Sequence, residues 1–295
     1  MAQPVNPVSG WQKLLTVVRT SFSSGLNEEL SGVEVEGAPV VIGQGNSLAY
    51  ALATNDDNPA YYKKTGAVVP PLFASRVFKD TLESLILYPG LGLSVLKMVH
   101  AEQVFTFHKP LRVGMEVIPM ARIGAFRKVS SGQIVEFEVT LLEQGEPIVS
   151  GMASMFQRTG KGKGGKKKAS GKSVIDFKEV TTFSISPDQP KRYALASRDY
   201  NPIHTKPLVA KLAGFPRPIA HGLCVLAVTT SLLTKEYADN DPARLAMVKV
   251  RFSKPALPGQ ELSLQAAPSD RGHTFQLLNP KGKPVLSMGE VKFRE

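Results

Sequence analysis

The sequence predicts an α+β protein in which one antiparallel domain occurs twice along the chain. Three observations support this prediction: an internal repeat, a change within each repeat from helix-like to strand-like patterns, and enough apolar residues for two cores. The chain has 295 residues, 42% of them hydrophobic, which is sufficient for two domains of ordinary size. Helices followed by consecutive hairpins are typical of α+β folds with an antiparallel sheet.

The internal repeat rests on three pairs of similar segments that occur in the same order. The first pair, YALATNDDNPAY and YALASRDYNPIH, shares Tyr, Ala, Leu, Ala, Asp, Asn and Pro at an offset of 143 positions. The matched pairs are residues 50–61 with 193–204, 107–116 with 252–261, and 145–150 with 282–287. Because three chance matches would seldom keep one order, we infer two copies of one fold, each of about 120 to 130 residues.

The segment between the copies has the composition of a linker. TGKGKGGKKKASGK contains only Gly, Lys, Ser, Ala and Thr, which bury little apolar area and, when similarly charged, repel one another. The sequence therefore predicts four parts. They are an N-terminal extension at 1–30, a degenerate first domain at 31–158, a Gly/Lys linker at 159–173 and a second domain at 174–295.

The charge of the chain is concentrated in this linker. The formal net charge is +11, which would suit a nucleic-acid or membrane-surface protein. Six of the lysines lie in the linker, so the rest of the chain carries only +5. No aromatic residues alternate with these lysines for base stacking. We therefore expect a solvated tether and no nucleic-acid partner, with a basic nucleic-acid-binding protein as the less favoured alternative.

Cysteine content and hydropathy indicate where in the cell the protein should reside. The single cysteine, Cys224, excludes an internal disulfide and any multi-cysteine metal cluster. The N-terminal residues lack the basic start and apolar run of a signal peptide. The longest apolar stretch, residues 219–233, is shorter than the roughly 20 residues of a membrane-spanning helix. We expect a soluble cytoplasmic protein without a membrane partner.

The second copy has clear signals for its elements. Residues 205–214 predict a short helix, with proline in its first turn and glycine just past its end. The segment GLCVLAVTTSLLT, residues 222–234, is apolar around nearly its whole circumference, which is typical of an enclosed helix. Strand-like runs separated by Gly-containing turns follow. They are LAMVKVRF, ELSLQAA, TFQLLN and PVLSMGEVKF.

The densest cluster of reactive side chains comes just before the enclosed helix. Pro202 fixes its own φ and pushes Asn201 out of the helical region, so Asp199 to His204 should form a tight turn. A carboxylate and an imidazole facing one point can move protons near neutral pH. Gly222 would add a backbone N–H at the positive end of a helix dipole, suitable for a developing oxyanion.

Other interpretations of this cluster remain open. Asp-x-Asn-Pro is ordinary turn chemistry, in which His204 would be a structural hydrogen-bonding residue. A metal site of Asp199, His204 and His221 fits no standard ligand spacing, and a Ser197–Asp199–His204 triad lacks a nucleophile elbow. His108, alone in a strand-like run, fits packing or the surface. We expect no metal and no cofactor.

The cluster resembles the signature of a known family. Tyr-x3-Ser-x-Asp-x-Asn-Pro-Ile-His, followed after sixteen residues by His-Gly, is similar to the MaoC-like, (R)-specific enoyl-thioester hydratases and dehydratases of the hotdog fold. The match runs without a gap from Tyr193 to Cys224. The two-copy layout is similar to the double-hotdog members, including mycobacterial β-hydroxyacyl thioester dehydratases. The resemblance implies an antiparallel sheet wrapped around a central helix in each repeat, with the two hotdogs joined into one sheet.

The resemblance also implies an activity, the reversible syn addition of water to a trans-2-enoyl thioester to give the (R)-3-hydroxyacyl thioester. Asp199 and His204 would activate the water, and the Gly222 N–H would bind the thioester oxygen. The family usually has glycine where this chain has Arg198, whose guanidinium would be able to meet a substrate phosphate. The expected substrate-binding residues are Ser197, Arg198, Asn201 and His221.

The implied partner is an acyl thioester of coenzyme A or of acyl carrier protein. The implied assembly is a monomer acting as a pseudo-dimer, or a homodimer of such units. A hotdog acyl-thioesterase is the main alternative, and it is disfavoured because thioesterases do not generally use an Asp-x-Asn-Pro-x-His loop.

The first copy departs from the signature. Tyr61 stands at the place of His204, Ala74-Ser75 stands roughly at that of His221-Gly222, and the intervening loop is four residues shorter. Asp56 therefore has no imidazole partner. We expect this copy to have lost catalysis and to serve a structural role, with room for a longer acyl chain.

Overall fold

The computed structural model describes residues 3–4, 25–94, 98–158 and 175–295. The predicted Gly/Lys linker and most of the N-terminal extension lie outside these ranges. The division of the chain into four parts therefore stays a prediction, and so does the role of the lysine run.

The first repeat has a short helix, a central helix and then long strands. Its helices are η1 (Glu28–Leu30), α2 (Gln44–Ala53), η2 (Pro59–Tyr62), η3 (Pro71–Phe73) and α3 (Ala74–Ile86). Its strands are β1 (Gln3–Pro4), β2 (Glu34–Glu36), β3 (Val40–Val41), β4 (Met98–Phe107), β5 (Glu116–Val129), β6 (Gly132–Glu143) and β7 (Glu146–Arg158).

The second repeat follows the same order. Its helices are α4 (Gln189–Ser197), η4 (Pro202–His204), α5 (Pro207–Leu212), α6 (Gly222–Tyr237) and η5 (Pro242–Arg244). Its strands are β8 (Lys178–Ser184), β9 (Leu245–Phe252), β10 (Glu261–Ser269), β11 (Gly272–Leu278) and β12 (Pro284–Phe293). The predicted helices at 205–214 and 222–234 are therefore confirmed as α5 and α6, and the bounds of β9 and β12 coincide with two of the strand-like runs.

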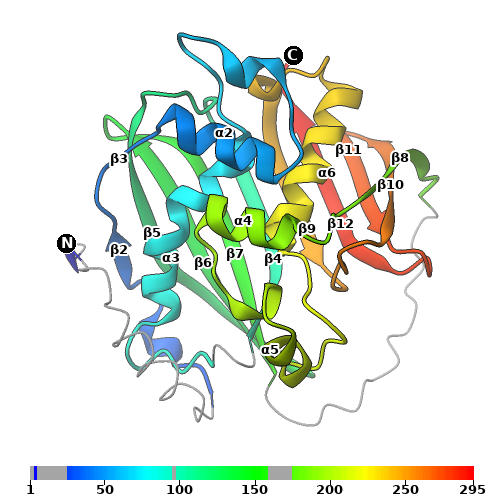
Figure 1. Ribbon diagram of the computed structural model, residues 1–295. Coiled ribbons are helices and arrows are strands. Elements are labelled where there is room, and N and C mark those ends of the chain that lie inside the picture. The colour runs from blue at the N-terminus through cyan, green and yellow to red at the C-terminus, as the bar shows by residue number, and fades with distance from the viewer. Residues whose placement is uncertain (1–2, 5–24, 95–97, 159–174) are drawn as a thin grey trace.

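All strands join in one 12-stranded sheet, and the helices lie against one face of it (Figure 1). The strand order is β1-β2-β5-β6-β7-β4-β9-β12-β11-β10-β8, with β3 beside β5. Only the β1–β2 pair is parallel among the pairings of the described strands. The two repeats meet at the antiparallel β4–β9 pair, where Gln103 lies opposite Val250. On either side of this pair the strands follow in corresponding order, which confirms the predicted antiparallel α+β fold.

The two central helices differ in how they are enclosed. Helix α6 buries residues all around its circumference, including Cys224, Val225, Leu226 and Ala227 in succession. Helix α3 (ASRVFKDTLESLI) is instead amphipathic and buries one face, with Phe78 and Leu85 inside. No helix in the described part of the chain is long and apolar enough to cross a lipid bilayer.

Candidate active site

The site begins where helix α4 ends. Its C-cap residue, Arg198, has φ 63° and ψ 17°, in the left-handed region. Glycine enters this region without strain, whereas a residue with a Cβ pays about 1–2 kcal/mol, so the geometry explains why glycine suits this position. The Arg198 guanidinium forms an ion pair with Asp80 of helix α3, with Nη1 and Oδ2 2.8 Å apart. The left-handed backbone turns the chain sharply at Asp199.

Short-range hydrogen bonds fix the turn that follows. The Asp199 N–H donates to Ser197 Oγ (3.2 Å), and the Asn201 N–H donates to Asp199 Oδ1 (3.1 Å). The Ile203 N–H donates to Asn201 Oδ1 at 3.3 Å, and Pro202 opens the 3-10 helix that carries His204. The predicted tight turn is confirmed. Ser197 donates its own hydroxyl hydrogen to Tyr193 O (2.7 Å), which gives it a structural role in this turn.

Two histidines are held beside Asp199 by backbone carbonyls. His204 Nδ1 lies 3.0 Å from Ile219 O, and His221 Nε2 lies 3.1 Å from Asp199 O. Because a carbonyl only accepts, each of these nitrogens carries a hydrogen. His204 therefore keeps a lone pair on Nε2. The two rings stack, with centroids 3.7 Å apart and planes at 27°.

Burial keeps both imidazoles neutral. Desolvation lowers the pKa of His204, and the nearby Asp199 carboxylate opposes that shift. Desolvation and the neighbouring His204 lower the pKa of His221 to about 4. At neutral pH the pair is therefore uncharged, and His204 Nε2 is a proton acceptor.

The site brings three possible metal ligands together, but their directions do not suit an ion. One ligand atom each from Asp199, His204 and His221 lies within 4.8 Å of the others. An imidazole binds a metal in the plane of its ring, through a nitrogen lone pair. Two nearly parallel, stacked rings do not direct their lone pairs to one point. This arrangement does not favour a metal at these three residues.

Gly222 lies at the N-terminus of helix α6. The first N–H groups of a helix have no acceptor within it and lie at the positive end of its dipole. A Cβ on Gly222 would come within 2.9 Å of the Phe252 ring, so Phe252 covers the Gly222 Cα closely. The approach to the helix is fixed by the Ala220 N–H, which donates to Ala256 O at 2.9 Å.

The first repeat adds residues that sequence reasoning missed. His100, on β4, packs its ring 4.7 Å from that of Phe252. Burial lowers the pKa of His100 to about 4, and the Asp199 carboxylate opposes the shift, so His100 lies within electrostatic reach of the site. Asp80 meets Arg198, and Arg76 donates to Ala196 O at 2.6 Å. None of the three belongs to a matched repeat segment, so the sequence offered no signal for them.

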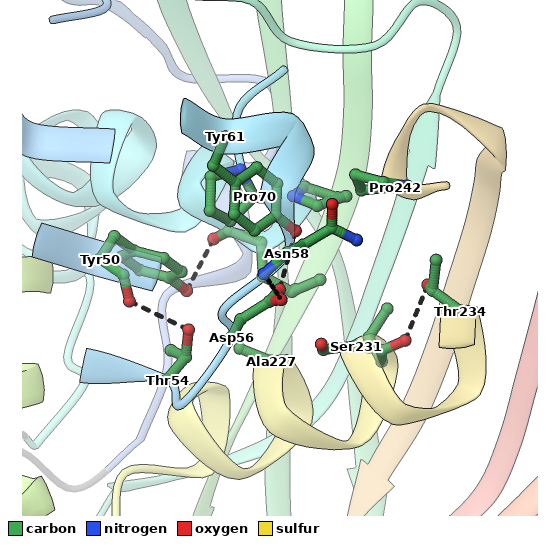
Figure 2. Close-up of a pocket in the computed structure, with 13 residues that line it drawn as sticks. Tyr50, Thr54, Asp56, Asn58, Tyr61, Pro70, Ala227, Ser231, Thr234 and Pro242 are labelled. Carbon is green, nitrogen blue, oxygen red and sulfur yellow. Dashed lines mark hydrogen bonds between the residues drawn. The ribbon is translucent and has the colours of Figure 1, made fainter. Parts of the chain in front are cut away.

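In the first repeat, Tyr61 stands at the position of His204 and occupies the carboxylate of Asp56 with a hydrogen bond. The Tyr61 hydroxyl donates to Asp56 Oδ2 at 2.7 Å, and both side chains are buried. Asn58 donates to Asn240 O of the second repeat at 2.6 Å. Figure 2 shows Asp56 and Tyr61 beside a small pocket, with Ser231 of α6 across from them.

The pocket can be compared with the expectation that the first repeat has room for a longer acyl chain. Much of its lining is polar, which does not favour an apolar acyl chain, so the chain-length prediction gains no support from it. Helix α3 begins at Ala74 and helix α6 begins at Gly222, so the helix starts fall within one residue of the rough correspondence made from the sequence.

Fold and site together define a double hotdog with a carboxylate–imidazole pair in its second repeat. Residues 167–283 match the family described as MaoC like domain, and residues 29–150 match the FAS1-like, dehydratase domain region. The chain therefore contains a MaoC-like dehydratase domain together with a FAS1-like dehydratase region.

Three known proteins illustrate the similarity. A MaoC-like dehydratase from Phytophthora capsici shares 26% identity and a TM-score of 0.75, over 92% of this chain and 98% of its own. The 3-hydroxyacyl-thioester dehydratase X of Mycobacterium tuberculosis is 29% identical, over 86% of this chain and 87% of its own. The mouse peroxisomal multifunctional enzyme type 2 is 33% identical over 69% of this chain. That match spans only 28% of the mouse protein.

Proposed function

We propose that this protein is a hydro-lyase that interconverts trans-2-enoyl and (R)-3-hydroxyacyl thioesters in fatty-acid metabolism. One observation carries the proposal: a carboxylate oxygen of Asp199 and a ring nitrogen of His204 lie within 4.8 Å of each other, and the helix that begins at Gly222 follows them in the chain. The names of the relatives, among them a 3-hydroxyacyl-thioester dehydratase, support the same reaction class.

The water is held by two acceptors. An Asp199 carboxylate oxygen and His204 Nε2 each accept one of its hydrogens, so the water oxygen directs a lone pair towards C3 of the substrate. As the O–C3 bond forms, one of the pair takes a proton from the water. Such positioned acid–base groups typically contribute about 10²- to 10⁴-fold in rate.

The electrons of the C2=C3 bond move towards the thioester carbonyl as the water adds. The Gly222 N–H donates to the carbonyl oxygen, which stabilises the enolate-like charge. The proton taken from the water then passes to C2, so water is consumed and no net proton is released. Because hydroxyl and proton both come from the side of the Asp199–His204 pair, the addition is syn.

The remaining site residues would position these groups and the substrate. Arg198 and His221 flank the pair, and Asn201 has a side-chain amide nitrogen free of the turn hydrogen bond. The thioester carrier would be coenzyme A or acyl carrier protein. We expect a pseudo-dimeric monomer or a homodimer of such units, working in the cytoplasm.

A hydration assay on trans-2-enoyl-CoA tests the proposal. The Asp199→Asn and His204→Gln variants should lose about 10²- to 10⁴-fold in kcat/KM. The matched control is Asp56→Asn in the first repeat, which should retain activity. Full activity in a folded Asp199→Asn protein would refute the proposal. Release of free thiol, detected with a thiol reagent, would identify a thioesterase instead.

A further inference from the structure

Helix α5 (Pro207–Leu212) is an addition to the second repeat. In the first repeat, residues 63–70, which connect η2 to η3, contain no helix. In the second repeat, α5 lies on the chain between His204 and Gly222, the two groups on either side of the reacting thioester. An element present only in the repeat that keeps the proton-transfer pair is a candidate for substrate delivery.

The outer face of α5 is apolar. Leu208 is 71% exposed and Leu212 is 81% exposed, and a spacing of four residues places them on one face of the helix. The helix is anchored from beneath by Ala210, which is fully buried and whose carbonyl accepts from the Phe215 N–H at 2.9 Å. Leu208 follows His204 by four residues, so their Cα atoms are within about 14 Å of each other.

Three cations lie close to the two leucines in the sequence. Lys206, Lys211 and Arg217 are exposed, and none of them forms an ion pair with another described residue. Residues 200–235 contain no aspartate or glutamate at all. A one-sign surface of this kind attracts and orients an acidic partner.

We infer that this surface, formed by Lys206, Leu208, Lys211, Leu212 and Arg217, docks an acidic acyl carrier protein. The inference rests on the proposed function, since the partner must bring a thioester to Asp199 and His204. An acidic helix with apolar side chains complements two leucines flanked by cations. Free coenzyme A would use the cations through its phosphates but would leave the exposed leucine pair without a partner.

Two pairs of variants test the surface against a matched control. Leu208→Ser with Leu212→Ser removes the apolar face, and Lys206→Glu with Lys211→Glu reverses its charge. The control is Lys63→Glu with Lys64→Glu, because Lys63 corresponds to Lys206 at the repeat offset of 143. Each protein is assayed with one trans-2-enoyl group, carried either by acyl carrier protein or by coenzyme A. Circular dichroism checks the fold.

With the carrier-protein substrate, we expect kcat/KM to fall about tenfold or more in both test pairs, and added salt should reduce the difference for the wild type. With the coenzyme A substrate, the leucine pair should stay within about twofold, and the charge-reversed pair should lose much less than it does with the carrier protein. Equal losses on both substrates, or no loss on the carrier protein, would overturn the inference. If the wild type hydrates only coenzyme A thioesters, the docking surface is wrong and the proposed function stands; if it hydrates neither, the proposed function has failed.

Discussion

Tyr50 and Tyr193 meet hydroxyl to hydroxyl, with their oxygens 3.3 Å apart and their ring centroids 5.6 Å apart. The two residues occupy the same position in the two repeats, so their contact marks the pseudo-twofold relationship between the halves. The Tyr193 ring also lies 4.9 Å from His221, which stacks on His204. The contact between the repeats thus continues through packed rings into the candidate active site.

The tyrosine pair predicts a non-additive loss of stability. Tyr50→Phe removes the Tyr50 hydroxyl from the buried Tyr193 hydroxyl, which keeps the Ser75 side chain as a neighbour, and we expect a cost of about 1–2 kcal/mol. Tyr193→Phe should cost less, because the Tyr50 hydroxyl still donates to Leu72 O at 2.9 Å. The double variant should lose less than the sum of the two, because the hydroxyl–hydroxyl contact can be lost only once. Urea unfolding of the four proteins measures this coupling, and strict additivity would contradict it.

Much of this molecule was predictable because repeats and turn chemistry are local signals. The Pro-Gly, Asp-Arg-Gly and Asn-Pro-Lys-Gly turns place Gly259, Gly272 and Gly282 at positive φ, as their strand-separating role required. The turn from Asp199 to His204 follows from Pro202 and two side-chain acceptors next to it in the chain.

The contributions of the first repeat to the site were not predictable. His100 and Asp80 reach it through the β4–β9 pairing and through the packing of α3 near α4, and both arrangements depend on the tertiary fold. Arg198 shows the same limit. The sequence placed an arginine where the family usually has glycine, but only the fold shows that its guanidinium reaches Asp80.

Arg198 predicts a coupling between backbone strain and an ion pair. Arg198→Gly relieves the left-handed backbone strain but loses the Asp80 contact, which, being half exposed, is worth about 0.2–1 kcal/mol. The change in the free energy of unfolding caused by Arg198→Gly should therefore be more stabilising in an Asp80→Asn protein than in the wild type, by about 0.2–1 kcal/mol. A double-mutant cycle measured by urea unfolding, repeated at high salt, tests this prediction. The coupling should shrink with salt, and its absence at low salt would contradict the ion pair.

The buried His221 predicts a loss of stability in acid. Its pKa is about 4 in the folded protein, against 6.5 for the unperturbed group. Below pH 6.5 the unfolded chain takes up the proton first, so the free energy of unfolding falls as the pH drops from 6.5 towards 4. His221→Gln should reduce the fall between pH 7.5 and 5 by about 2 kcal/mol.

Unfolding midpoints at several pH values measure this effect. His108 provides the control, since it lies at the surface with Nε2 2.9 Å from Ser150 Oγ. His108→Gln should keep the wild-type pH profile. An unchanged profile in His221→Gln would show that the imidazole is not held neutral by the fold.

The Asp56–Tyr61 contact predicts a loss of stability without a loss of activity. Burial raises the pKa of Asp56, and the Tyr61 hydroxyl bond opposes that shift. Tyr61→Phe removes the donor from a buried carboxyl group, and we expect a cost of about 1–3 kcal/mol. Hydration of the enoyl thioester should stay within about twofold, because this pair belongs to the first repeat. A large loss of kcat/KM in a folded Tyr61→Phe protein would mean that the first repeat takes part in the reaction.

Gly222 predicts a loss of activity that a second substitution should partly reverse. In Gly222→Ala the new Cβ would lie 2.9 Å from Phe252 Cε1, so either the ring or the first turn of α6 must move. Because a displaced oxyanion donor costs about 10²- to 10³-fold in kcat, we expect a fall of this size with Asp199 and His204 intact.

Phe252→Leu in the Gly222→Ala protein removes the ring and should restore part of the rate. Steady-state hydration kinetics of the two single variants and the double variant separate the effects. Full activity in Gly222→Ala would show that the α6 N-terminus does not bind the thioester oxygen. No recovery in the double variant would show that the clash with Phe252 does not cause the displacement of the Gly222 N–H.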